Sequence, residues 1–227
     1  MSNLPVMRAI AGGVMAFAIT CPLVVAGAWP AATMAAPLSC AAAPTAAQPP
    51  ASPAGPPAAP IPTEAVIAAE VNPPGDIPDN QAFVTYTAKD GGYSIAMPEG
   101  WARQESGPNV TFDDKLHQFS VEVRCAKTAP TVESAQTVEA ADLAQQVPAF
   151  ELVDVSAVDL PAGPGILVRY RTNSTPDEVT GKQIRLDVDR YELFQDGREA
   201  VISLAVPAGS DNVDVSNQVS RSFRWTA

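Results

Sequence analysis

His117 is the only histidine in this chain of 227 residues, so any catalytic arrangement that needs an imidazole base has to use it. Asp113 and Asp114 precede it in the stretch DDKLH, and two carboxylates with one imidazole are ligands that divalent metal ions accept. A metal site needs about four converging ligands, and a charged turn with an exposed loop histidine accounts for the same residues. We therefore expect no catalytic residue, no metal site and no cofactor.

Asp187 and Asp189 form a second candidate pair, since they lie two residues apart in a predicted strand and share one of its faces. Paired carboxylates can divide general acid and base roles. Arginines follow the same alternation in this part of the chain, and we expect the two aspartates to form cross-strand surface pairs with Arg185 or Arg169 instead. No glycine-rich loop of the kind that cradles phosphates occurs in the sequence.

The three cysteines are Cys21, Cys40 and Cys125. Cys21 and Cys40 are candidates for lipidation, but Thr20 and the spacing of Leu38 depart from the usual pattern, and unmodified residues are the favoured interpretation. An oxidising compartment would permit a disulfide between Cys40 and Cys125. A lone Cys125 buried as a small apolar side chain is the alternative.

The N-terminal segment resembles an export signal. Arg8 precedes twenty uncharged residues that end in Ala26-Gly27-Ala28, which has the small-x-small form of a cleavage site. The apolar run is also just long enough to span a bilayer, so residues 1–28 are predicted to be a signal peptide or an uncleaved anchor. We expect an exported protein, secreted or tethered on the outer side of the cytoplasmic membrane.

Residues 29–80 are predicted to be a disordered linker. Thirteen of the 23 prolines fall between Pro30 and Pro78, and large apolar residues are almost absent there, so the segment cannot offset the entropy of ordering. Its prolines favour an extended, semi-stiff spacer. The formal net charge of −11 argues against nucleic acid and anionic membrane surfaces as partners, so contact with a membrane is expected only through the N-terminal segment or a lipid anchor.

The remaining residues, 81–227, suffice for one α+β domain. Tyr93, Ile95 and Met97 share one face of a hairpin strand, and Trp101 is expected to fold back onto that face as an apolar plug. In the strand around Asp189 the apolar phase shifts, which indicates a bulge or burial on both faces. Two helices are predicted: one over 131–147, capped by Thr131 or Ser134, and one that begins at a capping box formed by Asp211 and Asp214 and ends at Phe223. The predicted strands cover residues 83–87, 93–97, 109–112, 118–127, 151–160, 165–172, 182–194 and 199–207.

These elements resemble a known family. The start GGYSIAMPEGW, the strand SVEV, the hairpin GILVRYR to YELFQDGREAVISLAVP and the ending SFRW look like the PsbP-like domain. The resemblance covers residues 83–225. It implies an α/β/α sandwich around an antiparallel sheet of about six to eight strands. With its proline- and alanine-rich linker the chain also resembles exported actinobacterial lipoproteins of the LpqN-like type and Ala/Pro-rich secreted antigens, some of which are adhesins.

From these features we expect a non-enzymatic accessory or binding module of the bacterial cell envelope, monomeric, with an unidentified envelope or extracellular protein or an apolar ligand as its partner. The alternatives are a carrier of an apolar ligand or lipid, and a surface adhesin or antigen. A metal-dependent enzyme that uses Asp113, Asp114 and His117 is the least favoured alternative.

Overall fold

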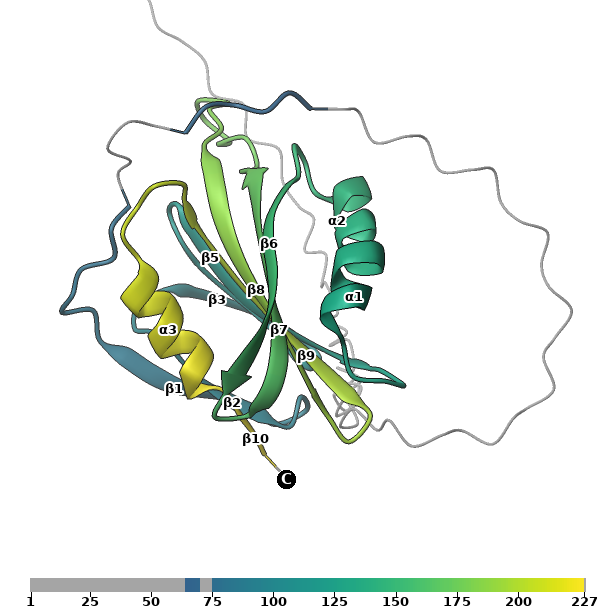
Figure 1. Cartoon of the computed structure of the whole chain (residues 1–227). Coiled ribbons are helices and arrows are strands. Elements are labelled where there is room, and N and C mark those ends of the chain that lie inside the picture. The colour runs from purple at the N-terminus through teal and green to yellow at the C-terminus, as the bar shows by residue number, and fades with distance from the viewer. Residues whose placement is uncertain (1–63, 70–74, 227) are drawn as a thin grey trace, which may run out of the picture. The chain divides into compact units, whose positions relative to one another are not determined.

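The computed structural model describes residues 64–69 and 75–226 (Figure 1). The described chain is mostly antiparallel β-sheet with few helices, as the α+β pattern predicts. Its larger sheet has seven strands in the order β3-β4-β5-β9-β8-β7-β6, and the smaller has the order β1-β2-β10. The predicted fold class, a central antiparallel sheet of about six to eight strands with helices on its two sides, is therefore confirmed.

Tight hairpins build the larger sheet, since most of its neighbouring strands also follow one another along the chain. A helical segment separates the hairpins β3-β4-β5 from β6-β7-β8-β9, and β9 returns to pair with β5. The strands are β3 (Ala102–Ser106), β4 (Asn109–Asp114), β5 (His117–Cys125), β6 (Glu151–Leu160), β7 (Gly163–Asn173), β8 (Arg185–Gln195) and β9 (Arg198–Pro207).

The smaller sheet joins the two ends of the domain. β1 (Phe83–Ala88) and β2 (Tyr93–Pro98) form the predicted hairpin, and the two-residue β10 (Arg224–Trp225) pairs with β2 on the other side. α3 (Val213–Ser222) directly precedes β10, and its Ser222 hydroxyl accepts a 2.8 Å hydrogen bond from the Ala96 amide. The last helix is thereby fixed to the first hairpin.

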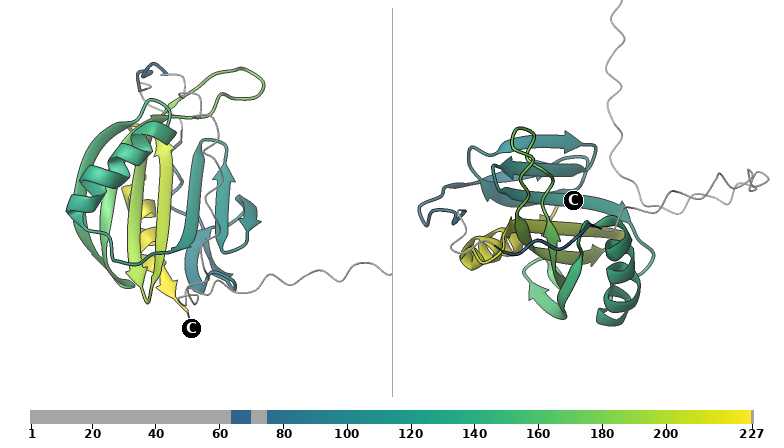
Figure 2. Two further views of the ribbon diagram at one scale, coloured as in Figure 1. Left: turned by 90° about the vertical axis from the view of Figure 1, so that its right-hand side faces the viewer. Right: turned by 90° about the horizontal axis from the view of Figure 1, so that it is seen from above.

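Helices cover both sides of the larger sheet (Figures 1 and 2). On one side α3 encloses the main core with Val215, Val219 and Phe223. On the other side one continuous helical segment consists of α1 (Val132–Ser134), the π-helical turn η1 (Ala135–Glu139) and α2 (Ala140–Gln146), and packs a second apolar cluster on β7 and β8. β7 divides its side chains between the two cores, as strand alternation requires.

Several local predictions can be compared with the structure. Tyr93, Ile95 and Met97 are at most 1% exposed, so the predicted apolar face is confirmed. Trp101 packs against the same core, and its ring lies 4.8 Å from that of Phe119 on β5. Thr131 caps α1 as predicted, in a capping box with Ser134. β8 keeps a regular register with both neighbours, so burial on both faces explains its shifted pattern.

The predicted capping box at Asp211 and Asp214 is wrong. The N-cap of α3 is Asn212, and its side chain makes no capping hydrogen bond. The Asn212 Oδ1 atom instead accepts a 2.8 Å hydrogen bond from the Ile77 amide, and its Nδ2 donates to the Gly75 carbonyl oxygen. Because the polar atoms of the Asn212 side chain bond to residues 75 and 77 of the predicted linker, they do not cap the helix.

Two stretches of the predicted linker contact the domain. Residues 75–80 lie beside the start of α3, where Ile77 is buried, and residues 64–69 lie beside the ends of β7 and β8. None of the helices in the described ranges is long and apolar enough to cross a membrane.

Candidate functional site

Of the residues singled out as an alternative metal site, His117 and Asp113 have side chains engaged in structural contacts, and Asp114 lies opposite His117 in the β4–β5 pairing. His117 is the first residue of β5 and only 7% exposed, its ring stacks on Trp101 at 5.5 Å, and its Nε2 atom lies 2.6 Å from the Gly75 carbonyl oxygen. The expectation of an exposed loop histidine is therefore wrong, because Trp101 and the 75–80 segment cover the ring. The Asp113 carboxylate accepts a 2.8 Å hydrogen bond from the Gln118 amide. Residues 64–69 and 75–226 contain no group of three or more His, Cys, Asp or Glu placed to hold a metal ion.

Of the cysteines, only Cys125 belongs to the described part of the chain. It ends β5, where it is exposed, and it is disulfide-bonded, so the alternative of a lone buried cysteine is wrong. Cys21 and Cys40 lie outside the described residues, so their lipidation and the pairing of Cys40 with Cys125 stay predictions.

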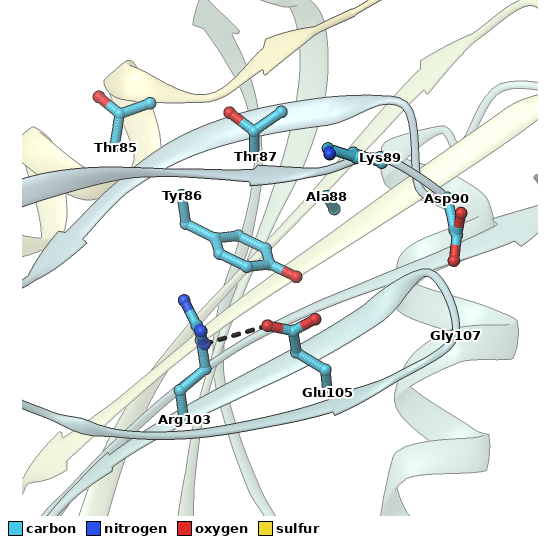
Figure 3. A pocket seen from close by; sticks show the side chains of 9 residues that line it. All are labelled: Thr85, Tyr86, Thr87, Ala88, Lys89, Asp90, Arg103, Glu105 and Gly107. Atoms are coloured by element: carbon cyan, nitrogen blue, oxygen red, sulfur yellow. Dashed lines mark ion pairs between the residues drawn. The ribbon is translucent and has the colours of Figure 1, made fainter. Parts of the chain in front are cut away.

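A polar groove of about 450 Å³ lies between the two sheets, where β1 and its turn face β3 (Figure 3). Its size is that of a small-ligand site, but ligand sites of that kind are lined mainly by apolar side chains. The Tyr86 side chain points from β1 toward β3, and Asp90 lies at the end of the groove that is next to Gly107. The lining residues are Thr85, Tyr86, Thr87, Ala88, Lys89, Asp90, Arg103, Glu105 and Gly107.

Tyr86, Arg103 and Glu105 form the centre of the groove. The Arg103 guanidinium lies 5.6 Å from the centroid of the Tyr86 ring, and its Nε donates to Glu105 Oε1 at 3.0 Å. The ring also meets Phe112 edge-on at 5.5 Å, which fixes it against the core. Both charged side chains are about half exposed, at 54% and 50%, so each keeps unused hydrogen-bonding positions toward solvent.

Burial raises the pKa of the Tyr86 phenol, the Glu105 carboxylate raises it further, and the Arg103 guanidinium acts in the opposite direction. The phenol therefore stays protonated at neutral pH and can donate a hydrogen bond. With Lys89 and Asp90 at the turn, the groove offers donors, an acceptor and an aromatic face within one opening. This combination suits the binding of a polar chain segment.

The strands that flank the groove are terminal in their sheets. Among the described strands β1 pairs with β2 alone, and β3 pairs with β4 alone. Ser106 of β3 and Asn109 of β4 face each other across a two-residue turn. Because hydrogen-bonded and non-hydrogen-bonded pairs alternate from there, we expect the backbone N–H and C=O groups of Arg103 and Glu105 to point away from β4. Edge strands of this kind can pair with another chain.

A second group of titratable residues lies under the η1 segment. Arg190 Nε pairs with Glu192 at 3.2 Å, its guanidinium also contacts Glu139, and Arg124 Nε pairs with Glu199 at 2.7 Å. Arg124 also reaches Glu139, at 3.7 Å. Glu139 thereby joins the helical segment to β8 through Arg190 and to β5 through Arg124, and Arg124 continues the network to Glu199 on β9. The Glu192 and Glu199 side chains are less than 10% exposed, so we assign the cluster a structural role.

Burial raises the pKa of the Glu192 carboxyl, and the Glu139 and Glu199 carboxylates raise it further, while Arg190 acts in the opposite direction. As pH rises, the unfolded chain then loses this proton before the folded protein does. The stability that Glu192 contributes is present below its unfolded pKa and is lost as pH rises through the folded pKa. In Glu192→Gln this dependence disappears, so the free energy of unfolding of the variant, minus that of the wild type, should increase from pH 4 to pH 7. Urea denaturation across this range measures the difference, and a value that does not change with pH would contradict the assignment.

The groove was not predicted from the sequence, because β3 carries no strand pattern. All five residues of the stretch ARQES are exposed and four of them are polar, so no apolar alternation marks it as a strand. One sequence signal for β3 was present: the turn residues Gly107-Pro108 directly precede the predicted strand at Asn109. A two-residue turn of this kind indicates a hairpin, and therefore a partner strand that ends at Ser106.

Comparison with known proteins gives a likeness of fold. No family model matches the chain, and no curated protein matches it. Among solved structures it is similar to cyanobacterial PsbP from Synechocystis, with 16% identity, coverage of 66% of this chain and 98% of that chain, and a TM-score of 0.47. It is also similar to the Ran-binding protein Mog1p of Saccharomyces cerevisiae, with 12% identity, coverage of 64% of this chain and 96% of that chain, and a TM-score of 0.42. A third similar structure is a protein of unknown function from Pseudomonas aeruginosa described as a putative regulator, with 11% identity, coverage of 62% and 94%, and a TM-score of 0.40. The first of these has the fold that the sequence resemblance implied, and at these identities the likeness concerns the fold alone.

Proposed function

We propose that the protein is an exported, non-enzymatic binding module of the bacterial cell envelope, and that it takes an extended segment of a partner protein in the groove between β1 and β3. Export is inferred from the apolar N-terminal segment with its small-x-small ending, followed by the proline- and alanine-rich stretch. The actinobacterial lipoprotein type rests on the sequence resemblance of this stretch and of the GGYSIAMPEGW start.

The observation that carries the binding role is the groove itself, in which a tyrosine, an arginine and a glutamate lie between two terminal strands. Terminal strands can bind an extended peptide through main-chain hydrogen bonds, and adjacent side chains then supply specificity. Arg103 and Glu105 are suited to that second task, because each is half exposed and they carry opposite charges.

The packing favours this binding mode over the carriage of an apolar ligand. The space between the sheets and α3 is filled by large apolar side chains that are less than 2% exposed, among them Tyr93, Met97 and Phe223. An apolar ligand there would have to displace core side chains, whereas the groove is open and its lining is largely polar. A polar partner segment therefore needs no rearrangement of the core.

Site-specific photo-crosslinking in the native host tests the proposal. A photo-reactive residue replaces Lys89 at the groove, and in a matched control it replaces Gln218, which is exposed on α3. The expected result is a discrete adduct with an envelope or external protein from position 89 that is absent from position 218. Equal adducts from the two positions, or none from position 89, would count against the groove as the binding surface.

A further inference from the structure

A buried asparagine at the end of β7 holds the main chain of residues 64–67. Asn173 is 2% exposed, and its Nδ2 donates to the Ala65 carbonyl oxygen at 3.0 Å, while its Oδ1 accepts from the Ile67 amide at 3.5 Å. The Asn173 side-chain amide thus bonds to the C=O of Ala65 and to the N–H of Ile67, two residues later. In a parallel β-sheet the backbone of one residue bonds to its neighbouring strand in the same way, so this contact suits an extended segment.

The side chain of Glu64 is recognised as well. Its Oε1 accepts from Asn173 Nδ2 at 2.9 Å and from Gln183 Nε2 at 2.6 Å. Charge-assisted hydrogen bonds of this kind are stronger than those between neutral groups. Ala65 and Val66 are exposed, while Glu64 and Ile67 are half-buried, so the domain contacts the first and fourth residues of the segment more closely than the two between them.

The receptor side of the contact is held in place independently of the linker. Arg185, 3% exposed, donates to Asn173 Oδ1 at 3.1 Å and to the Ala149 carbonyl oxygen at 2.7 Å, and it pairs with Glu151 at 2.9 Å. Gln183 is further bonded to the Ser174 carbonyl oxygen at 3.0 Å. A buried polar group without partners is costly, so Asn173 requires hydrogen-bonding groups from whatever segment lies over it.

We propose that Asn173, Gln183 and Arg185 form a second binding site, specific for an extended peptide of the form Glu-x-x-aliphatic, and that Glu64 to Ile67 of the linker occupy it within the same chain. The site lies at the ends of β7 and β8 and involves none of the groove residues. Occupation in cis fixes the point at which the linker meets the domain. Release of the linker exposes a site that the same peptide chemistry can fill from another molecule.

Hydrogen exchange on the full chain tests the occupation in cis. The Ile67 amide is expected to exchange more slowly in the wild type than in Asn173→Asp, because an aspartate cannot donate to Ala65 and repels the Glu64 carboxylate. We expect a loss of protection of about tenfold or more, which corresponds to the net energy of one hydrogen bond. Thr87→Ala, at the groove, is the control and should leave Ile67 unchanged. Equal exchange of Ile67 in the wild type and in Asn173→Asp would overturn the proposal.

Peptide titration tests the specificity of the site. The full chain carrying Glu64→Lys and Ile67→Asp has a linker segment that no longer fits the site. When the synthetic peptide TEAVIA is added to this variant, the Asn173 side-chain amide resonances should shift. Millimolar peptide is needed, because that is the effective concentration that a short tether supplies. A peptide with lysine in place of the glutamate should not. Absence of a shift with TEAVIA, or equal shifts with both peptides, would overturn the assigned recognition.

Discussion

Replacing Arg190 with methionine is expected to lower the free energy of unfolding by about 3–5 kcal/mol, because the substitution removes the cation that pairs with the buried Glu192 carboxylate. The Arg190 side chain is 10% exposed, and its partners Glu192 and Glu139 are 3% and 19% exposed. Glu139 lies in η1, so the loss also weakens the attachment of the helical segment to the sheet. Urea denaturation at pH 7, followed by far-ultraviolet circular dichroism, measures the change.

Two controls separate this effect from a general loss of packing. Arg169→Met removes a half-exposed pair with Asp189 and is expected to cost no more than about 1 kcal/mol. The double variant with methionine at both 190 and 192 removes the pair together and should recover much of the loss. An Arg190→Met protein within about 1 kcal/mol of the wild type would show that the buried Glu192 carboxylate does not depend on this arginine.

Replacing Phe223 with alanine is expected to cost about 3–5 kcal/mol, the range for removing a buried phenylalanine. The side chain is fully buried, its ring stacks on Tyr93 at 5.5 Å, and the Trp225 ring meets it edge-on at 5.1 Å. It lies at the junction of α3 and β10, so the cavity would loosen the contact between the last helix and the first hairpin.

Thermal denaturation measures the Phe223 effect, with Phe223→Leu as the control. Leucine keeps most of the apolar volume and is expected to cost less than about 1.5 kcal/mol. The fluorescence of Trp225 should also change in the alanine variant, because its ring loses its aromatic neighbour. Equal stabilities of the leucine and alanine variants would contradict the stacked core.

Much of the fold could be predicted because its apolar residues follow simple periods. Tyr93, Ile95 and Met97 alternate along β2, and Val215, Val219 and Phe223 recur at helical spacing, so local pattern alone indicates which face is buried. The surface pairs followed in part from the same alternation. Arg169 pairs with Asp189 as expected, while Asp187 pairs with Arg171 in place of Arg185.

The candidate sites could not be predicted in this way, because they depend on contacts between segments far apart in the chain. Arg185 is directed to Glu151 and Asn173, and Asn212 is directed to Ile77. β3 carries no apolar side chain that turns toward the core, so its position beside β1 follows only from the assembled sheets. A polar residue in a sequence does not show which distant main chain it will bind.

The binding role of the groove is tested most directly by titration of the partner captured through position 89. Wild type is compared by calorimetry with a variant in which Arg103→Glu and Glu105→Arg reverse the ion pair without changing the net charge, and with Gln218→Arg on α3 as the control. Affinity is expected to fall at least about tenfold, or 1.4 kcal/mol, in the reversed variant alone. If the reversed variant and the wild type bind with equal affinity, the groove is not the binding surface.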